Sequence, residues 1–265
     1  MVCGSPLAAS DRPIRSKAIE HLWENARSPL FLWAVILTTA TLVCGGVANV
    51  LAPATLSETV RAYARQAGIQ QQPMMNAVFA LSQWLGLLPT AINAVGLWLI
   101  VLSARRAQKP LSIAGLTICQ VIQTVNLVTF ILAFLGAVIS VTAIVGGAGD
   151  PDVVGAWAGM LTGTMGTWIP AIIIAVLAIR SIRAAKSVLT TGAATDKIPG
   201  AFPVICFILG GLTGFAVLLS LPAADAAGWV GLARSAISAA VHILFGLVLV
   251  RVRGERGPAL GRERH

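Results

Sequence analysis

The chain has 265 residues, of which 57% are hydrophobic and 11% are charged, against about 25% charged residues in a typical soluble domain. It carries 19 basic and 10 acidic residues, for a formal net charge of +9. This composition excludes an ordinary soluble domain, and the segments between the long apolar runs are too short for an attached ATPase, kinase or DNA-binding module.

Residues 1–29 form the first predicted unit, a cytoplasmic segment that contains an amphipathic helix. Ile19, Leu22, Trp23 and Ala26 recur at helical spacing, so they share one face. Such a helix is typical of a segment that lies on the inner leaflet of a membrane. It either sets the entry angle of the first span or is the elbow helix that precedes the first span of some exporter permeases.

Six apolar runs follow, and each is long enough for the roughly 20 residues that a helix needs to cross a bilayer core. They form one transmembrane domain over residues 30–252, followed by a basic cytoplasmic tail over residues 253–265. The runs lie near residues 30–52, 77–102, 118–146, 155–179, 201–221 and 233–250. The predicted fold class is all-α, a polytopic membrane helix bundle with six transmembrane helices.

Lysine and arginine residues gather on one side of these spans. All but Arg61, Arg65 and Arg234 lie before span one, between spans two and three, between spans four and five, or in the tail. By the positive-inside rule, both termini are expected in the cytoplasm. Because the basic residues follow the topology, they predict contact with the lipid bilayer and no binding of nucleic acid.

The residues that usually carry chemistry are sparse. The four cysteines form no C-x-x-C pair, and every Asp and Glu lies outside the predicted spans. No P-loop, nucleophile with a base, or metal-ligand cluster is found in the sequence. The sequence therefore predicts no cofactor, no metal and no catalytic residue, and it argues against an enzyme.

Glycines recur at intervals of four in two spans. Span four contains Gly155, Gly159 and Gly163, and span five contains Gly210 and Gly214. Such a stripe lets another helix backbone approach closely. The partner helix is either in the same chain or in a second copy of it.

The third span is the most polar of the six. It carries Gln120, Gln123 and Asn126, and span two adds Asn93. Because a buried amide without a partner is costly, these side chains are expected to face the protein interior or a wet cavity. They either form hydrogen bonds between helices or line a polar pathway.

One ionisable residue, His242, lies near the middle of span six. Arg234 and Ser238 precede it on the same stripe of the helix. An intramembrane ionisable residue is a functional candidate. The alternative is a neutral histidine bonded to a neighbouring helix, because a proton relay usually needs a second titrating group and the spans hold no carboxylate.

Two short stretches resemble a group of uncharacterised six-span membrane proteins of Gram-positive bacteria. They are the run from Ser28 to Phe31, which opens span one, and the run from Gly115 to Thr117 that leads into Val121, Ile122 and Asn126. The resemblance implies a location in the bacterial plasma membrane and carries no particular activity.

Three functions remain compatible with the sequence. The first is a non-catalytic accessory or scaffolding protein that packs with itself or with another membrane protein, which the glycine stripes favour. The second is the permease subunit of a transporter powered by a separate ATPase. The third is a membrane enzyme centred on His242.

Overall fold

The computed structural model describes residues 11–51, 73–147, 151–192, 198–221 and 226–254, and these residues form seven helices and no strand. The helices are α1 (Asp11–Arg27), α2 (Pro29–Leu51), α4 (Pro73–Arg106), α5 (Lys109–Gly147), α6 (Pro151–Thr191), α7 (Ala201–Ser220) and α8 (Ala226–Gly254). All except α1 are long and apolar enough to cross a membrane. The predicted all-α fold with six spans is confirmed.

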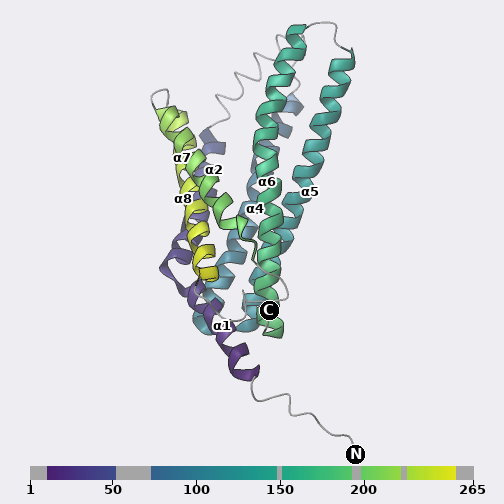
Figure 1. The fold of residues 1–265 in the computed structure, drawn as a ribbon. Helices are drawn as coiled ribbons and strands as arrows, with labels where there is room; N and C mark the ends of the chain where they lie inside the picture. The colour runs from purple at the N-terminus through teal and green to yellow at the C-terminus, as the bar shows by residue number, and fades with distance from the viewer. Residues whose placement is uncertain (1–10, 52–72, 148–150, 193–197, 222–225, 255–265) are drawn as a thin grey trace, which may run out of the picture.

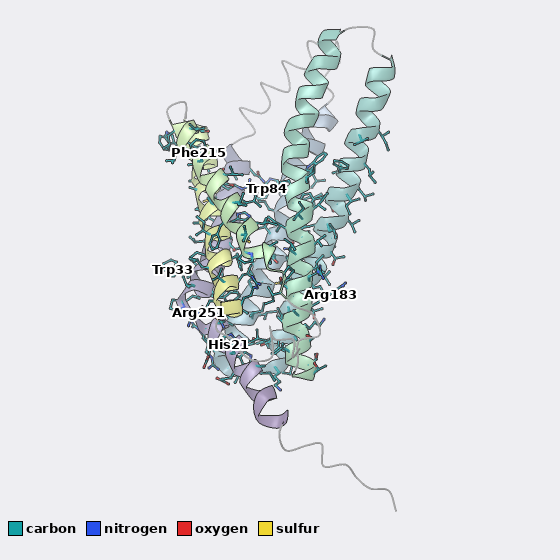
Figure 2. The ribbon with its side chains drawn as sticks, viewed as in Figure 1. His21, Trp33, Trp84, Arg183, Phe215 and Arg251 are labelled. Atoms are coloured by element: carbon teal, nitrogen blue, oxygen red, sulfur yellow. The ribbon has the colours of Figure 1, made fainter. Side chains whose placement is uncertain are left out.

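The six long helices are arranged as an arc. Helix α7 packs on α8, α8 on α2, α2 on α4, α4 on α5 and α5 on α6, whereas α6 and α7 make only slight contact. Figure 1 shows α7 diverging from α6 with distance from α1. His21, Arg183 and Arg251 lie at the same end of the bundle as α1 (Figure 2), which is called the basic end below.

Helices α5 and α6 are longer than the apolar runs predicted at 118–146 and 155–179. They contain 39 and 41 residues, which corresponds to about 60 Å of helix each, twice the roughly 30 Å of a bilayer core. Figure 1 shows both helices reaching beyond α7 and α8 at the end opposite the basic end.

The last turns of α6 are helical although their basic residues were predicted to lie in a loop. Arg180 and Arg183 are exposed there, while Ala184 and Val188 on the other side of the helix are fully buried. Val188 packs in a cluster with Ile19 of α1. The helix continues past the apolar run because α1 covers one of its faces.

Ser28 fixes the junction between α1 and α2. Its hydroxyl donates to the carbonyl oxygen of Asn25 (2.6 Å) and accepts from the backbone N–H of Phe31 (3.3 Å). Pro29 occupies the first helical position, where a missing N–H costs no hydrogen bond. A serine cap followed by proline is therefore the local reason that one helix ends here and the next begins.

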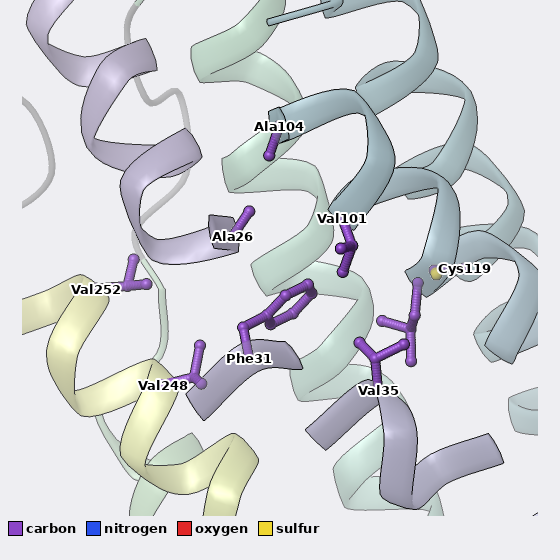
Figure 3. Close-up of a cluster of buried hydrophobic side chains, with 9 residues drawn as sticks. Ala26, Phe31, Val35, Val101, Ala104, Cys119, Val248 and Val252 are labelled. Atoms are coloured by element: carbon purple, nitrogen blue, oxygen red, sulfur yellow. The ribbon is translucent and has the colours of Figure 1, made fainter. Parts of the chain in front are cut away.

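A buried apolar cluster joins five helices near the basic end. Phe31 and Val35 of α2 lie at its centre, and Figure 3 shows the Phe31 ring pointing toward Val101 of α4. The ring also meets Phe245 of α8 edge-on, with centroids 6.3 Å apart. The buried members are Ala26, Phe31, Val35, Leu97, Val101, Ala104, Cys119, Val248 and Val252.

The backbones of α4 and α5 approach each other most closely at two glycines. A Cβ added to Gly115 would lie 2.7 Å from the carbonyl oxygen of Gly96, and one added to Gly96 would lie 2.6 Å from Sγ of Cys119. Neither glycine belongs to the two series of glycines at intervals of four that the sequence showed in spans four and five. The crossing therefore requires glycine at Gly115, because a backbone atom cannot move aside as a flexible side chain can.

We expect Gly115→Ala to lower the stability of the protein by about 1–3 kcal/mol, the usual cost of overpacking. Gly136→Ala on the same helix is the matched control, because an added Cβ there meets no atom within 4 Å. It should leave the melting temperature in detergent unchanged or slightly raised, since alanine favours helix over glycine. Equal losses in the two variants would contradict the close crossing of α4 and α5.

Candidate functional site

A partly enclosed cavity of about 530 Å³ lies inside the arc of helices. Helix α1 and all six long helices contribute side chains to its wall. Its volume falls within the roughly 300–1,000 Å³ of small-molecule sites, which are concave and mostly apolar with a few placed polar groups. It is the candidate functional site of this chain.

Helix α1 contributes the wall of the cavity at the basic end through Leu22, Asn25 and Ala26. Trp23 attaches α1 to α5, because its indole N–H donates to the hydroxyl of Ser112 (3.3 Å). Ser112 in turn shares a hydrogen bond with Ser103 of α4, and both serines are buried. A short polar network therefore holds α1, α4 and α5 together beside the cavity.

Arg27 provides a second attachment of α1. Its Nε donates to the carbonyl oxygen of Ala104 (2.7 Å) in the last turn of α4, where a positive charge is favoured by the helix dipole. Its guanidinium also pairs with Glu20 at 3.4 Å. Asn25, only 3% exposed, donates to the carbonyl oxygen of His21, and its Oδ1 is left without a partner.

The apolar face of α1 packs largely on protein. Ala18 and Ile19 are buried against Val188 and Leu189 of α6, with Leu22 and others partly buried around them. The sequence pattern identified this face as apolar. It carried no signal for what covers the face, because a lipid leaflet and a helix surface select the same residues.

Four of the seven polar residues singled out from the sequence line the cavity together. They are Asn93 of α4, Gln123 and Asn126 of α5, and His242 of α8. Gln120, Arg234 and Ser238 are not part of the cavity wall. The structure thus brings together residues from the second, third and sixth spans.

Four amide side chains line the cavity, and three of them, unlike Asn25, make no hydrogen bond with a described residue. Within the described residues, no hydrogen bond joins the side chain of Asn93, Gln123 or Asn126 to another residue. None of their polar atoms is sealed off in the way that Oδ1 of Asn25 is. These groups are therefore available to a molecule inside the cavity.

His242 makes a hydrogen bond within its own helix. Its Nδ1 lies 2.8 Å from the carbonyl oxygen of Ser238, one turn earlier, rather than bonding to a neighbouring helix. Because a carbonyl only accepts, Nδ1 donates this bond, and in the uncharged tautomer that does so Nε2 is an acceptor. The ring is thus oriented by α8 itself.

Arg234 and the second glycine stripe lie outside the cavity wall. The guanidinium of Arg234 packs over Gly45 of α2, 3.7 Å from where a Cβ would stand. Gly210 lets α7 approach α8, since a Cβ there would lie 3.0 Å from the carbonyl oxygen of Ala239, whereas at Gly214 the nearest atom is 4.0 Å away. Gly155, Gly159 and Gly163 belong to α6, but their surroundings lie outside the described part of the structure.

Sequence reasoning missed several residues of the cavity wall. Thr38 and Ser181 line it, and each hydroxyl donates to a carbonyl of its own helix, at 2.7 Å and 2.8 Å. Cys119 and Cys206 also line it. Single small polar residues in apolar runs form no pattern, so the sequence held no signal that would have identified them.

No Asp, Glu, Lys or Arg is among the described residues of the cavity wall, which include the imidazole of His242. Among the described residues, no group of three or more His, Cys, Asp or Glu lies close enough together to hold a metal ion. The arrangement can accept and donate hydrogen bonds, and its described residues offer no carboxylate, lysine or arginine to a ligand.

No family model, curated protein or solved structure matches the chain. The six long apolar helices are those of a multi-pass membrane protein.

We expect Asn93→Leu and Gln123→Leu to change the stability in detergent by less than about 1 kcal/mol, because neither change breaks a hydrogen bond within the protein. Thr39→Val is the control, because it leaves the indole N–H of Trp98, which donates to Thr39 at 3.1 Å, without its acceptor. That variant should lose about 1 kcal/mol or more. If the amide variants unfold at lower temperature than Thr39→Val, the amides hold the helices together instead.

Proposed function

We propose that the protein is a non-catalytic membrane component that holds a small molecule between its spans, as the permease subunit of a transporter powered by a separate ATPase. The observation that carries this proposal is a set of polar groups that have no partner among the described residues and that line one cavity. Three amides and Nε2 of His242 converge there from α4, α5 and α8.

The cavity supports a permease over the accessory or scaffolding role that the sequence favoured. A scaffold gains nothing from amides without partners inside the membrane, where each costs free energy unless water or a ligand satisfies it. Apolar side chains at Asn93, Gln123 and Asn126 would serve a scaffold better. A substrate site, in contrast, needs such groups to select what it binds.

The proposed energy source follows from the composition of the spans. The predicted spans contain no Asp or Glu, so the chain offers no membrane carboxylate for coupling to protons or sodium. Helix α1, at the basic end, exposes Glu20 and Glu24 beside the exposed Arg183 end of α6. This surface is the proposed docking face for the ATPase.

The proposed location is a bacterial plasma membrane, with both termini in the cytoplasm. Arg105 and Arg106 end α4, and Arg251 and Arg253 lie in the last turn of α8. Lys109 begins α5 beside them. A concentration of positive charge at one end of the spans favours that end for the cytoplasm.

An enzyme centred on His242 has less support. Within the described part of the cavity wall, no carboxylate or lysine could serve with the imidazole as a second acid or base. Cys119 and Cys206 are buried in the wall, a setting typical of inert structural cysteines.

The cavity is expected to be reached by water. In a chain whose four cysteines are replaced by alanine, Ala178→Cys places a thiol in the cavity wall, and Val176→Cys places one on the outer face of α6, where Val176 is 39% exposed. Because thiolate forms only where water reaches, a small cationic methanethiosulfonate should modify position 178 at least about tenfold faster. Equal rates would contradict a substrate cavity.

The transporter part of the proposal predicts a partner. Purification of the tagged chain from its native membrane in mild detergent should recover a nucleotide-binding protein in stoichiometric amount, identified by mass spectrometry. A second multi-pass protein tagged in the same membrane serves as the control. Recovery of the chain alone, or with the same proteins as the control, would overturn the ATPase partnership.

A further inference from the structure

The wall of the cavity restricts the charge of what it can bind. None of the wall residues that the structure describes is an Asp, Glu, Lys or Arg. A charged group taken from water into this space would lose its hydration without gaining an ionic partner, which is costly in an apolar environment. The occupant that fits the proposed function is therefore uncharged.

Three polar groups of the wall, one each from α4, α5 and α8, lie at a similar depth. Asn93 lies 13 residues before the end of α4 at Arg106, and Gln123 lies 14 residues after the start of α5 at Lys109, so both are about 20 Å of helix from the basic end. His242 lies 11 residues before Arg253, or about 16 Å. These groups form a polar band near the middle of the membrane.

The wall between this band and α1 is mainly apolar, with Asn25 of α1 and Ser181 of α6 as its polar members. Ile100 of α4, Leu116 of α5, Ile182 of α6, Phe202 of α7 and Val248 of α8 line that section. A molecule that matches both the polar band and the apolar section of the wall has a polar head and a hydrocarbon part. The volume of about 530 Å³ suits a drug-sized molecule with one chain.

Among the neighbouring long helices of the arc, α6 and α7 are the pair that packs least closely beside the cavity. These helices make only slight contact and diverge away from the basic end (Figure 1). Both contribute to the wall, through Ala178 of α6 and Cys206 of α7. Their outer faces carry exposed apolar side chains, among them Val176, Val204 and Ile208. A molecule dissolved in the bilayer can therefore enter here.

Building on the proposed function, we infer that the cavity binds a neutral single-chain amphiphile taken from the bilayer. Its uncharged hydroxyl-bearing head lies among the amides of Asn93 and Gln123 and Nε2 of His242. Its hydrocarbon chain occupies the apolar section toward α1. A hydroxyl suits this band because it donates to Nε2 and to amide oxygens and accepts from amide N–H groups.

The test uses radiolabelled monoolein, a neutral single-chain lipid with two hydroxyls, and the full-length chain immobilised in dodecyl maltoside. Monoolein should bind saturably. Oleoyl lysophosphatidate has the same chain with a charged head, and it should compete at least about tenfold more weakly. Glycerol, the head without the chain, should not compete. Competition by lysophosphatidate as strong as that by unlabelled monoolein would overturn the inference.

Point variants distinguish the loss of contacts with the head of the lipid from a loss of folding. Gln123→Leu should weaken monoolein binding about tenfold, as expected for lost hydrogen bonds, whereas Gln120→Leu on the same helix, outside the wall, should bind like the wild type. Ala178→Trp should abolish binding by filling the cavity. Size-exclusion profiles and melting temperatures establish that each variant is folded. Equal affinities of the Gln120 and Gln123 variants would overturn the placement of the head.

The inference and the proposed function can fail separately. If monoolein does not bind saturably while a thiol at position 178 still reacts, the amphiphile is wrong and the small-molecule cavity stands. If monoolein does not bind and that thiol is also unreactive, both are wrong.

Discussion

The fold depends on how tightly its helices are held at one end. At the basic end, Phe31 and Val35 pack with residues of four other helices, and α1 is attached to the α4–α5 pair by Trp23 and Arg27. Away from that end, α7 diverges from α6. The cavity lies inside the arc beside this packed end, and Ala26, Phe31 and Val248 belong both to the apolar cluster and to the cavity wall.

The polar groups of the membrane domain are of two kinds. Some are satisfied by the protein itself: Trp98 donates to Thr39, and Thr38 to the carbonyl of Ala34. Asn93 and Gln123 have no such partners within the described structure. Since unsatisfied amides in an apolar environment cost free energy, this second kind indicates a binding role more strongly than residue type alone.

The sequence predicted the six spans because apolar length and the distribution of lysine and arginine reflect the bilayer directly. It did not predict where α6 ends, because its last turns depend on burial of Val188 against α1. It also could not distinguish Gln120 from Gln123, since both amides lie on the same polar part of α5 and only the packed orientation of the helix places Gln123 in the wall. Gly96 and Gly115 were missed because a single close crossing leaves no repeat in the sequence.

The most direct test of this account is an experimental density map of the full-length chain in lipid nanodiscs, at a resolution that shows side chains. The account predicts α6 and α7 apart beside a cavity closed by α1, with non-protein density in contact with Gln123 and His242. A bundle in which α6 and α7 pack along their lengths, with the amides bonded to one another and no space between them, would contradict it.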